Sequence, residues 1–254
     1  MVSAEITGIG WVTTAGMGCG KDHDRFDTPC GPLPEIAPAD VFDKPYPHFG
    51  RMDKYSRIGL TAIAFALKDA GLAEWKVKRN IGIIASTVYG CLGTDVDYYD
   101  TVMSKKGLGA SPALFSYTLP NSFLGEAAIR FGLTGKSFIV NEQVPSGLAC
   151  LNMSLDSIGC GESKTMLCGV CDLGCPPALG ANSNLPPGAL FFVIDKSPMK
   201  GSSTYGTVSL DRKYRILFRQ TEIEDLTMLV RKCLTGYRSR QGKSKTLGIH
   251  VQTR

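Results

Sequence analysis

The chain has 254 residues, of which 43% are hydrophobic and 20% charged, and its formal net charge is +5. These are ordinary values for a globular protein that buries a sizeable core, in one large domain or two small ones. No charged region followed by an apolar run begins the chain, and no stretch approaches 18 uninterrupted apolar residues, so we expect neither a secretory signal nor a membrane-spanning helix. Nine cysteines, an odd number without framework spacing, suit a reducing cytosol, and we expect a cytoplasmic protein.

Positive residues gather late in the chain, in "DRKYRILFR" (residues 211–219) and "RKCLTGYRSRQGKSK" (residues 231–245). A basic edge can meet nucleic acid, a membrane surface or an acidic protein. No nucleic-acid-binding motif accompanies these residues, so a solvated face is the favoured interpretation. We therefore expect no nucleic acid and no membrane among the partners.

Strand and helix patterns alternate along the first part of the chain. A β-branched strand at residues 4–16 ends in glycines, and the Pro-, Asp- and Gly-rich residues 17–50 are expected to be irregular. Residues 53–72 predict a mostly buried helix with Gly71 as its stop. Residues 81–87, "IGIIAST", predict a strand of the type that a parallel sheet buries on both faces.

The alternation continues to the end of the sequence. The elements expected there are helices at residues 95–107 and 120–133, a strand at 136–142, a helix at about 146–162, strands at 164–170, 188–195 and 204–210, a helix at 222–234 and a strand at 245–251. The segment "DKSPMKGS" is expected to join strands 188–195 and 204–210 as a hairpin-like connection. Alternating buried strands and helices predict a layered α/β architecture.

The segment "VNEQVPSG" (residues 140–147) turns from a strand into a helix. Such a turn is a favoured place for a nucleophile, because the N-terminus of a helix stabilises negative charge. This one holds neither cysteine nor histidine, and its candidate nucleophile is Ser146, directly before Gly147.

Four stretches resemble, in order and approximate spacing, the N-terminal half of a β-ketoacyl synthase. They are "TGIGWVTTAG", "RMDKYSRIGLTAIAFALKDAGL", "SGLACLNMSLDSIGCGESKTMLCGVCD" and "PGALFFVID", and the resemblance covers most of residues 4–195. It implies the thiolase fold, in which two related βαβαβαββ halves stack as α-β-α-β-α layers. For this chain it implies a thiolase-like layered α/β fold with a mixed, mostly parallel sheet, in a single domain of residues 1–254. The second half is expected to be largely missing, with residues 222–254 as its short remnant.

The resemblance also assigns the turn a chemistry that these residues do not support. In the family the turn reads roughly Asp-Thr-Ala-Cys-Ser-Ser-Gly, and its cysteine takes the acyl group from the carrier. Aligning Ser146 and Gly147 with the final Ser-Gly puts Val144 at the cysteine position, with Gln143 before it and Pro145 after it. Valine cannot form a thioester, so the favoured interpretation of Val144 and Pro145 is structural filling without thiolate chemistry. Related decarboxylating synthases and chain-length partners place glutamine at the cysteine position, whereas Gln143 lies one residue early.

Active condensing enzymes of this family also use two histidines from the second half of the fold. His23 and His48 lie outside any family motif. His250 falls where the family's His-Gly-Thr loop would come, although Val251 and Gln252 replace the Gly-Thr. A functional role for His250 is possible on this alignment, but a strand-end position is favoured, and we expect no second catalytic histidine.

Other reactive residues have simpler interpretations. Cys150 is expected to be a small core residue, since free cysteine is among the most buried residue types. Cys168, Cys171 and Cys175 have C-x2-C-x3-C spacing but no fourth ligand in a companion motif, so no metal is expected. Ser86 with residues 90–93 does not have the spacing of a phosphate-binding loop. We expect no cofactor.

Two functional hypotheses follow from the resemblance. The first is a non-catalytic, chain-length-factor-like subunit of fatty acid or polyketide biosynthesis. It would dimerise through strand 136–142, with itself or with a complete ketosynthase, and contact an acyl carrier protein. The alternative is an acyltransferase or malonyl-carrier decarboxylase that uses Gln143 or Ser146, and a degenerate remnant without acyl function is a third reading. A missing second half would leave an apolar face, which residues 222–251 are expected to cover in part.

Overall fold

The computed structural model describes residues 2–23, 25–104, 106–180, 185–199 and 201–248, with side chains up to residue 239. Within these residues the strands are β1 (Val2–Thr13), β2 (Gly16–Cys19), β3 (Ile81–Thr87), β4 (Ser137–Asn141), β5 (Thr165–Asp172), β6 (Gly188–Asp195), β7 (Gly206–Leu210), β8 (Ile216–Phe218) and β9 (Thr221–Glu222). The helices are α1 (Pro38–Val41), α2 (Lys54–Asp69), α3 (Leu92–Met103), α4 (Pro112–Phe115), α5 (Ser122–Phe131), α6 (Leu148–Gly159) and α7 (Leu226–Gly248), with short 3-10 turns at Pro47–Arg51 and Pro177–Leu179.

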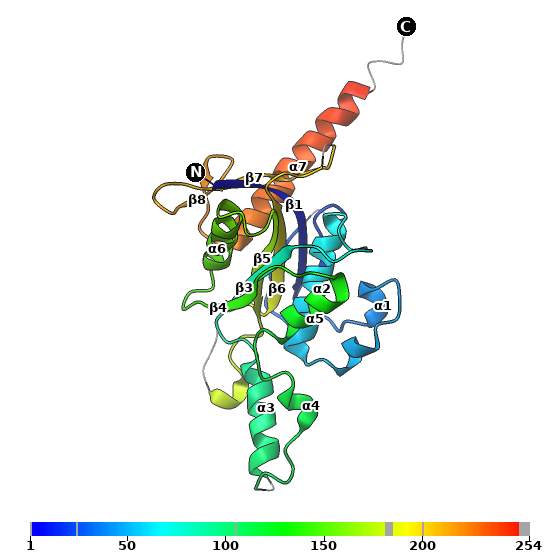
Figure 1. The fold of residues 1–254 in the computed structure, drawn as a ribbon, viewed down its shortest axis with the longest axis vertical. Coiled ribbons are helices and arrows are strands. Elements are labelled where there is room, and N and C mark those ends of the chain that lie inside the picture. Colours follow the sequence, from blue (N-terminus) through cyan, green and yellow to red (C-terminus); the bar gives the residue numbers. More distant parts are fainter. Residues whose placement is uncertain (1, 24, 105, 181–184, 200, 249–254) are drawn as a thin grey trace.

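All of these strands belong to one sheet, whose order is β4-β3-β5-β6-β1-β7-β8-β9, with β2 paired to β1 (Figure 1). Strand β3 pairs in parallel with β4 and β5, and β6 pairs antiparallel with both β5 and β1. Strands β4, β3, β5 and β1 therefore run in one direction and β6 opposes them. These five central strands confirm the predicted mixed, mostly parallel sheet in a thiolase-like layered fold, whereas β2, β7, β8 and β9 add antiparallel pairs to it.

Helices cover the two faces of the sheet, as alternate side chains of one strand show. On β6, Phe191 and Val193 belong to the core shared with α2 and α5. Their neighbours Phe192 and Ile194 belong to the core shared with α6 and the first turns of α7. Because successive side chains of a strand point to opposite faces, β6 fills both cores. The first turns of α7 thus pack on the same face of the sheet as α6.

The contact between α2 and β1 explains the glycines at the start of the sequence. Helix α2 begins where the side chain of Asp53 accepts a hydrogen bond from Ser56 N at 2.9 Å, a standard N-cap. A Cβ atom at Gly10 of β1 would lie 2.2 Å from the nitrogen of Ala66. Glycine therefore lets the helix pack directly against the backbone of the strand.

Three details differ from the expectations. Strand β7 does not form a hairpin with β6, because β5 and β1 already occupy both edges of β6, and β7 pairs with the free edge of β1 instead. Residues 245–248 belong to α7 rather than to a strand, in agreement with the helix propensity of the Arg, Gln and Lys residues before them. The segment 17–50, expected to be irregular, contributes β2 and α1.

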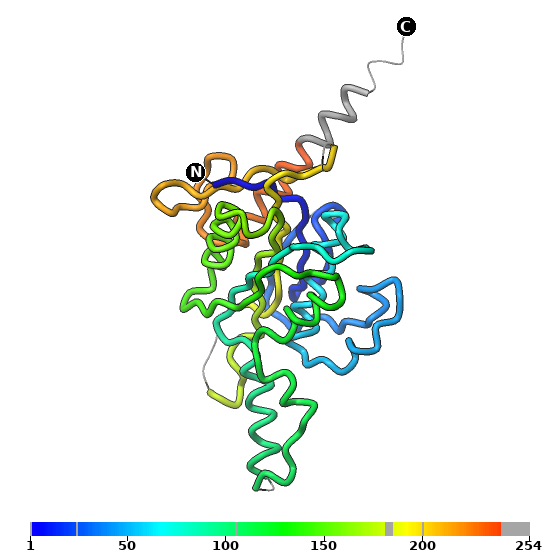
Figure 2. The backbone as a smooth tube through the Cα atoms, viewed as in Figure 1, coloured from blue at the N-terminus to red at the C-terminus, as the bar shows by residue number. Residues whose placement is uncertain are grey.

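Two groups of helices project from the molecule in opposite directions. Helices α3 and α4 form an arm at one end of the molecule (Figures 1 and 2), and α7 extends away from the other end (Figure 1). Within the described part of the chain, no helix combines the length and apolar character needed to span a membrane.

Candidate functional site at the strand-to-helix turn

The turn segment, residues 142–147, connects the end of β4 to the start of α6 and closes tightly. Ser146 N donates a hydrogen bond to Val144 O at 2.8 Å. Gly147 is the N-cap of α6, with φ of 69°. A Cβ atom at Gly147 would lie 2.6 Å from the side chains of Leu226 and Val170. Both the backbone angle and the space therefore require glycine here.

The carboxylate of Glu142 fills the concave side of this turn. Its Oε1 atom accepts hydrogen bonds from Ser86 Oγ at 2.6 Å and from Ala149 N at 3.0 Å. Its Oε2 atom accepts from Ser146 Oγ at 3.1 Å and from Gly147 N at 3.0 Å. Two of these donors are backbone N–H groups at the N-terminus of α6, where an anion is favoured. Glu142 therefore caps α6 and ties it to the end of β3.

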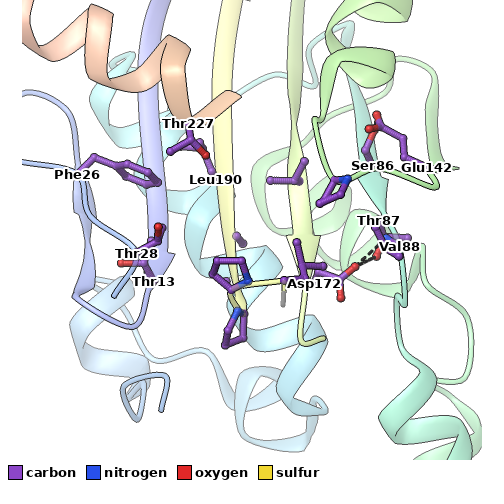
Figure 3. A pocket seen from close by; sticks show the side chains of 17 residues that line it. Thr13, Phe26, Thr28, Ser86, Thr87, Val88, Glu142, Asp172, Leu190 and Thr227 are labelled. Carbon is purple, nitrogen blue, oxygen red and sulfur yellow. Dashed lines mark hydrogen bonds between the residues drawn. The ribbon is translucent and has the colours of Figure 1, made fainter. Parts of the chain in front are cut away.

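A second carboxylate, that of Asp172 at the end of β5, organises the loop after β3. Asp172 is 7% exposed, and its Oδ2 atom accepts from Thr87 Oγ1 at 2.9 Å, Val88 N at 2.7 Å and Tyr89 N at 2.9 Å. Its Oδ1 atom accepts from Gly174 N at 2.8 Å. Figure 3 shows this carboxylate directed at the backbone of the β3 loop. Asp172 thus supplies the acceptor that a buried turn requires.

These two carboxylates flank a cavity of about 170 Å³ at the ends of several strands. Side chains reach it from β1, the early loop, β3, β5, β6 and the start of α7 (Figure 3). The lining residues are Thr13, Phe26, Thr28, Ser86, Thr87, Val88, Glu142, Pro145, Val170, Asp172, Leu185, Pro186, Pro187, Gly188, Ala189, Leu190 and Thr227. The lining combines hydroxyls with apolar side chains, and its carboxylates are already engaged as acceptors.

The candidate residues of the turn, residues 143–146, differ in their exposure and in their contacts. Val144 is 70% exposed, so it does not fill the floor of a pocket as the structural-filling interpretation implied. Pro145 lines the cavity, three residues before the first residue of α6. Gln143 is exposed. The hydroxyl of Ser146 donates to Glu142 and accepts from Leu148 N at 3.2 Å. Ser146 is thus part of the cap.

The histidines do not meet the turn. His23 makes an edge contact with Trp11, with ring centroids 5.8 Å apart, and His48 stacks on Tyr46 at 6.0 Å. His250 lies outside the described residues.

Cys150 lies deep in α6. It is fully buried, and its thiol donates towards Gly147 O at 3.0 Å and Gly169 O at 3.2 Å. Burial raises the pKa of the Cys150 thiol to about 12, so the thiolate needed for nucleophilic attack is not populated near neutral pH.

The C-x2-C-x3-C cysteines are separated by the sheet. Cys168 and Cys171 are buried in the cores on opposite faces of β5, and Cys175 follows the strand in a half-exposed position. Burial raises the pKa of both core thiols. In the part of the chain that the structure describes, no group of three or more His, Cys, Asp or Glu residues could hold a metal ion.

Sequence reasoning overlooked Glu142 and Asp172. Glu142 lies six residues before Leu148, the first residue of α6, and so outside the N-cap position at which a local capping signal is recognised. Its partner Ser86 is 56 residues away, so the complete arrangement depends on the pairing of β3 with β4.

Comparison with known proteins agrees with this architecture. The family model for the β-ketoacyl synthase N-terminal domain matches residues 34–184. This match spans more than half of the chain, which therefore belongs to the β-ketoacyl synthase family. No curated protein matches the chain in a sequence search.

Solved structures share the fold at low sequence identity. The ishigamide ketosynthase/chain length factor has a TM-score of 0.65 and 19% identity, over 82% of this chain and 62% of that one. A β-ketoacyl synthase from Burkholderia phymatum has a TM-score of 0.62 and 19% identity, over 82% of this chain and 63% of that one. The ketosynthase ApeO in complex with its chain length factor ApeC, from Xenorhabdus doucetiae, has a TM-score of 0.59 and 16% identity, over 78% and 81%. This chain thus spans less than two thirds of the first two proteins.

Proposed function

We propose that this chain is a non-catalytic, chain-length-factor-like subunit of polyketide or fatty acid biosynthesis. The observation that carries the proposal is the Glu142 carboxylate, which takes up the backbone donors at the N-terminus of α6. An acyl-transferring thiolate gains its stabilisation from such a helix N-terminus. In this chain a fixed side-chain anion uses that stabilisation, and the aligned cysteine position holds Val144.

The alternative, an acyltransferase or decarboxylase, has no comparable support. Ser146 would need a general base, and its polar partner Glu142 is already the acceptor of four hydrogen bonds. Gln143 is exposed on the outside of the turn and does not line the cavity. We therefore do not propose this activity.

The partner that we propose is a second copy of the chain or a complete ketosynthase, paired along β4. Strand β4 ends the strand order of the described sheet, and its Phe138 side chain is 37% exposed. An edge strand presents unpaired N–H and C=O groups that another strand can use. The arm beyond it also exposes large apolar side chains, namely Tyr99, Met103, Leu108 and Phe115. Ketosynthase/chain length factor pairs occur among the structural neighbours.

The proposal extends to an acyl carrier protein as a second partner and to a cytoplasmic location. One structural neighbour is an acyl carrier protein in complex with its ketosynthase. A carrier protein is acidic, and the basic residues of 211–245 offer complementary charge. We propose a single domain over residues 1–254, with residues 222–254 as a short remnant of the fold's second half.

A labelling experiment tests whether the chain is non-catalytic. The chain is incubated with acyl- and malonyl-loaded carrier protein, and intact-mass spectrometry and carbon dioxide release are measured. We expect neither a covalent acyl adduct nor decarboxylation. The variant Val144→Cys, with Val144→Ala as its control, should also form no ketoacyl product in the isolated chain. A ketoacyl product from Val144→Cys would identify a silenced enzyme and contradict the proposal.

Light scattering during size-exclusion chromatography tests the pairing at β4. Phe138→Lys should shift the chain, alone or mixed with a complete ketosynthase, from dimer towards monomer. Val77→Lys introduces the same charge at a 77% exposed apolar side chain outside β4 and serves as the control. Pairing through β4 would be contradicted if both variants left the dimer unchanged. It would also be contradicted if the unmutated chain formed no dimer, either alone or with a complete ketosynthase.

A further inference from the structure

The hairpin between β8 and β9 has an unusual two-residue turn. Its residues, Arg219 and Gln220, both have positive φ angles, 47° and 70°. Two-residue hairpin turns of this kind strongly prefer Asn-Gly or similar pairs, because other side chains are strained there. An arginine in this position departs from local preference, and such departures concentrate at functional sites.

The guanidinium of Arg219 is held in one place. Its Nη2 atom donates to Tyr205 O at 2.5 Å, and its Cζ atom lies 5.1 Å from the centroid of the Phe218 ring. Two glycines provide the space. A Cβ atom at Gly236 of α7 would lie 2.5 Å from Nη1, and one at Gly206 of β7 would lie 2.6 Å from Nε. The sequence thus leaves a slot for this side chain on both sides.

Further cationic groups surround the slot. Arg219 lines an open depression of about 390 Å³ together with Arg231, Lys232, Thr235 and Gly236. The last four positions lie on neighbouring turns of α7, at a spacing that places them on one side of the helix. In the described part of the chain, the salt bridges join Lys136 to Glu162 and Arg215 to Asp211 and Glu222. None of the three cations of the depression belongs to them.

We propose that this depression, the phosphoryl site, binds a phosphate group, either as inorganic phosphate or as a small phosphomonoester. A fixed guanidinium offers N–H groups in a planar fork, which matches two oxygens of a phosphate. The ammonium of Lys232 and the guanidinium of Arg231 add positive charge beside it. The site lies five to ten residues along α7 from Leu226, which contacts the strand-to-helix turn. Among the described residues, the depression and the cavity share no lining residue, and the phosphoryl site does not rest on the proposed function.

Isothermal titration calorimetry tests the phosphoryl site, with inorganic phosphate and glycerol 3-phosphate as probes at constant ionic strength. We expect saturable one-to-one binding of at least one probe. Lys232→Gln and Arg231→Gln should each weaken it about tenfold, as expected when a charge-assisted hydrogen bond is lost. Arg212→Gln removes the same charge from the exposed turn between β7 and β8 and should leave the affinity within about twofold.

Gly236→Ala distinguishes binding at the phosphoryl site from general electrostatic attraction, because this substitution leaves the net charge of the chain unchanged. Its Cβ atom would displace the Arg219 guanidinium, whereas alanine favours the helical backbone of α7. We expect weaker binding with an unchanged melting temperature. Binding of glycerol 3-phosphate at least as tight as that of phosphate would assign the site to an ester, and the reverse order to free phosphate. Absence of saturable binding by both probes, or an equal loss in Arg212→Gln, would overturn the proposal.

Discussion

Replacement of Glu142 by alanine is the sharpest perturbation of the turn segment, because it removes the carboxylate that accepts hydrogen bonds from four donors. Ser86 Oγ and Ser146 Oγ lose their carboxylate partner, and Gly147 N and Ala149 N lose the helix cap. The variant Glu142→Gln keeps the size of the side chain and one acceptor oxygen. Its amide nitrogen cannot accept from the remaining donors.

The expected loss of stability follows from these contacts. Loss of an N-cap acceptor costs about 0.5–2 kcal/mol. Ser86 is 2% exposed, and an unsatisfied buried donor costs about 1–3 kcal/mol. Glu142 itself is half-buried, so water replaces part of what is removed. We therefore expect Glu142→Ala to lower the free energy of unfolding by about 2–3 kcal/mol and Glu142→Gln by about 1–2 kcal/mol.

Urea denaturation followed by circular dichroism measures both values, with Glu74→Ala as the control for loss of an exposed carboxylate. Glu74→Ala should change the free energy of unfolding by less than about 0.5 kcal/mol. If Glu142→Ala were as stable as this control, the carboxylate would not be holding the turn, and the reasoning about α6 would be refuted.

Three further predictions concern buried groups. Iodoacetamide at pH 8 should modify the exposed Cys30 and Cys160 in the native chain but not Cys150, because burial raises the pKa of the Cys150 thiol to about 12. Rapid labelling of Cys150, measured by peptide mass spectrometry, would show an accessible thiol and contradict this prediction. Gly147→Ala should lower the unfolding free energy by at least about 2 kcal/mol, because of its positive φ and the crowded Cβ position, and an unchanged urea midpoint would contradict this. Burial raises the pKa of Asp69, so the Asp69 carboxyl binds a proton more tightly in the folded state than in the unfolded state. The contribution of Asp69 to the free energy of unfolding therefore falls as pH rises from the pKa of the unfolded state through that of the folded state. The stability of wild type minus that of Asp69→Asn should therefore decrease with pH across that window, and a rising difference in urea titrations would reverse the assignment.

Much of the fold can be predicted from local patterns of the chain. The apolar run of β3 and the apolar period of α2, with Gly71 as its stop, predicted these two elements close to their observed positions. Order and type of the central elements followed in the same way, because apolar periodicity reports directly which faces are buried. The turn before α6 was also recognisable, since a glycine at a strand-to-helix junction is a local requirement.

The amino-acid sequence alone thus determined the types of the central elements, the family resemblance and the absence of a cysteine in the turn. It could not determine that β1 separates β6 from β7, because pairing partners depend on which strand edges the rest of the sheet leaves free. Nor could it determine that Glu142 caps α6 or that Arg219 lies between two glycines. Each of these arrangements joins residues from distant segments, and a hydrogen bond or a close approach between them forms only when the sheet has brought the segments together.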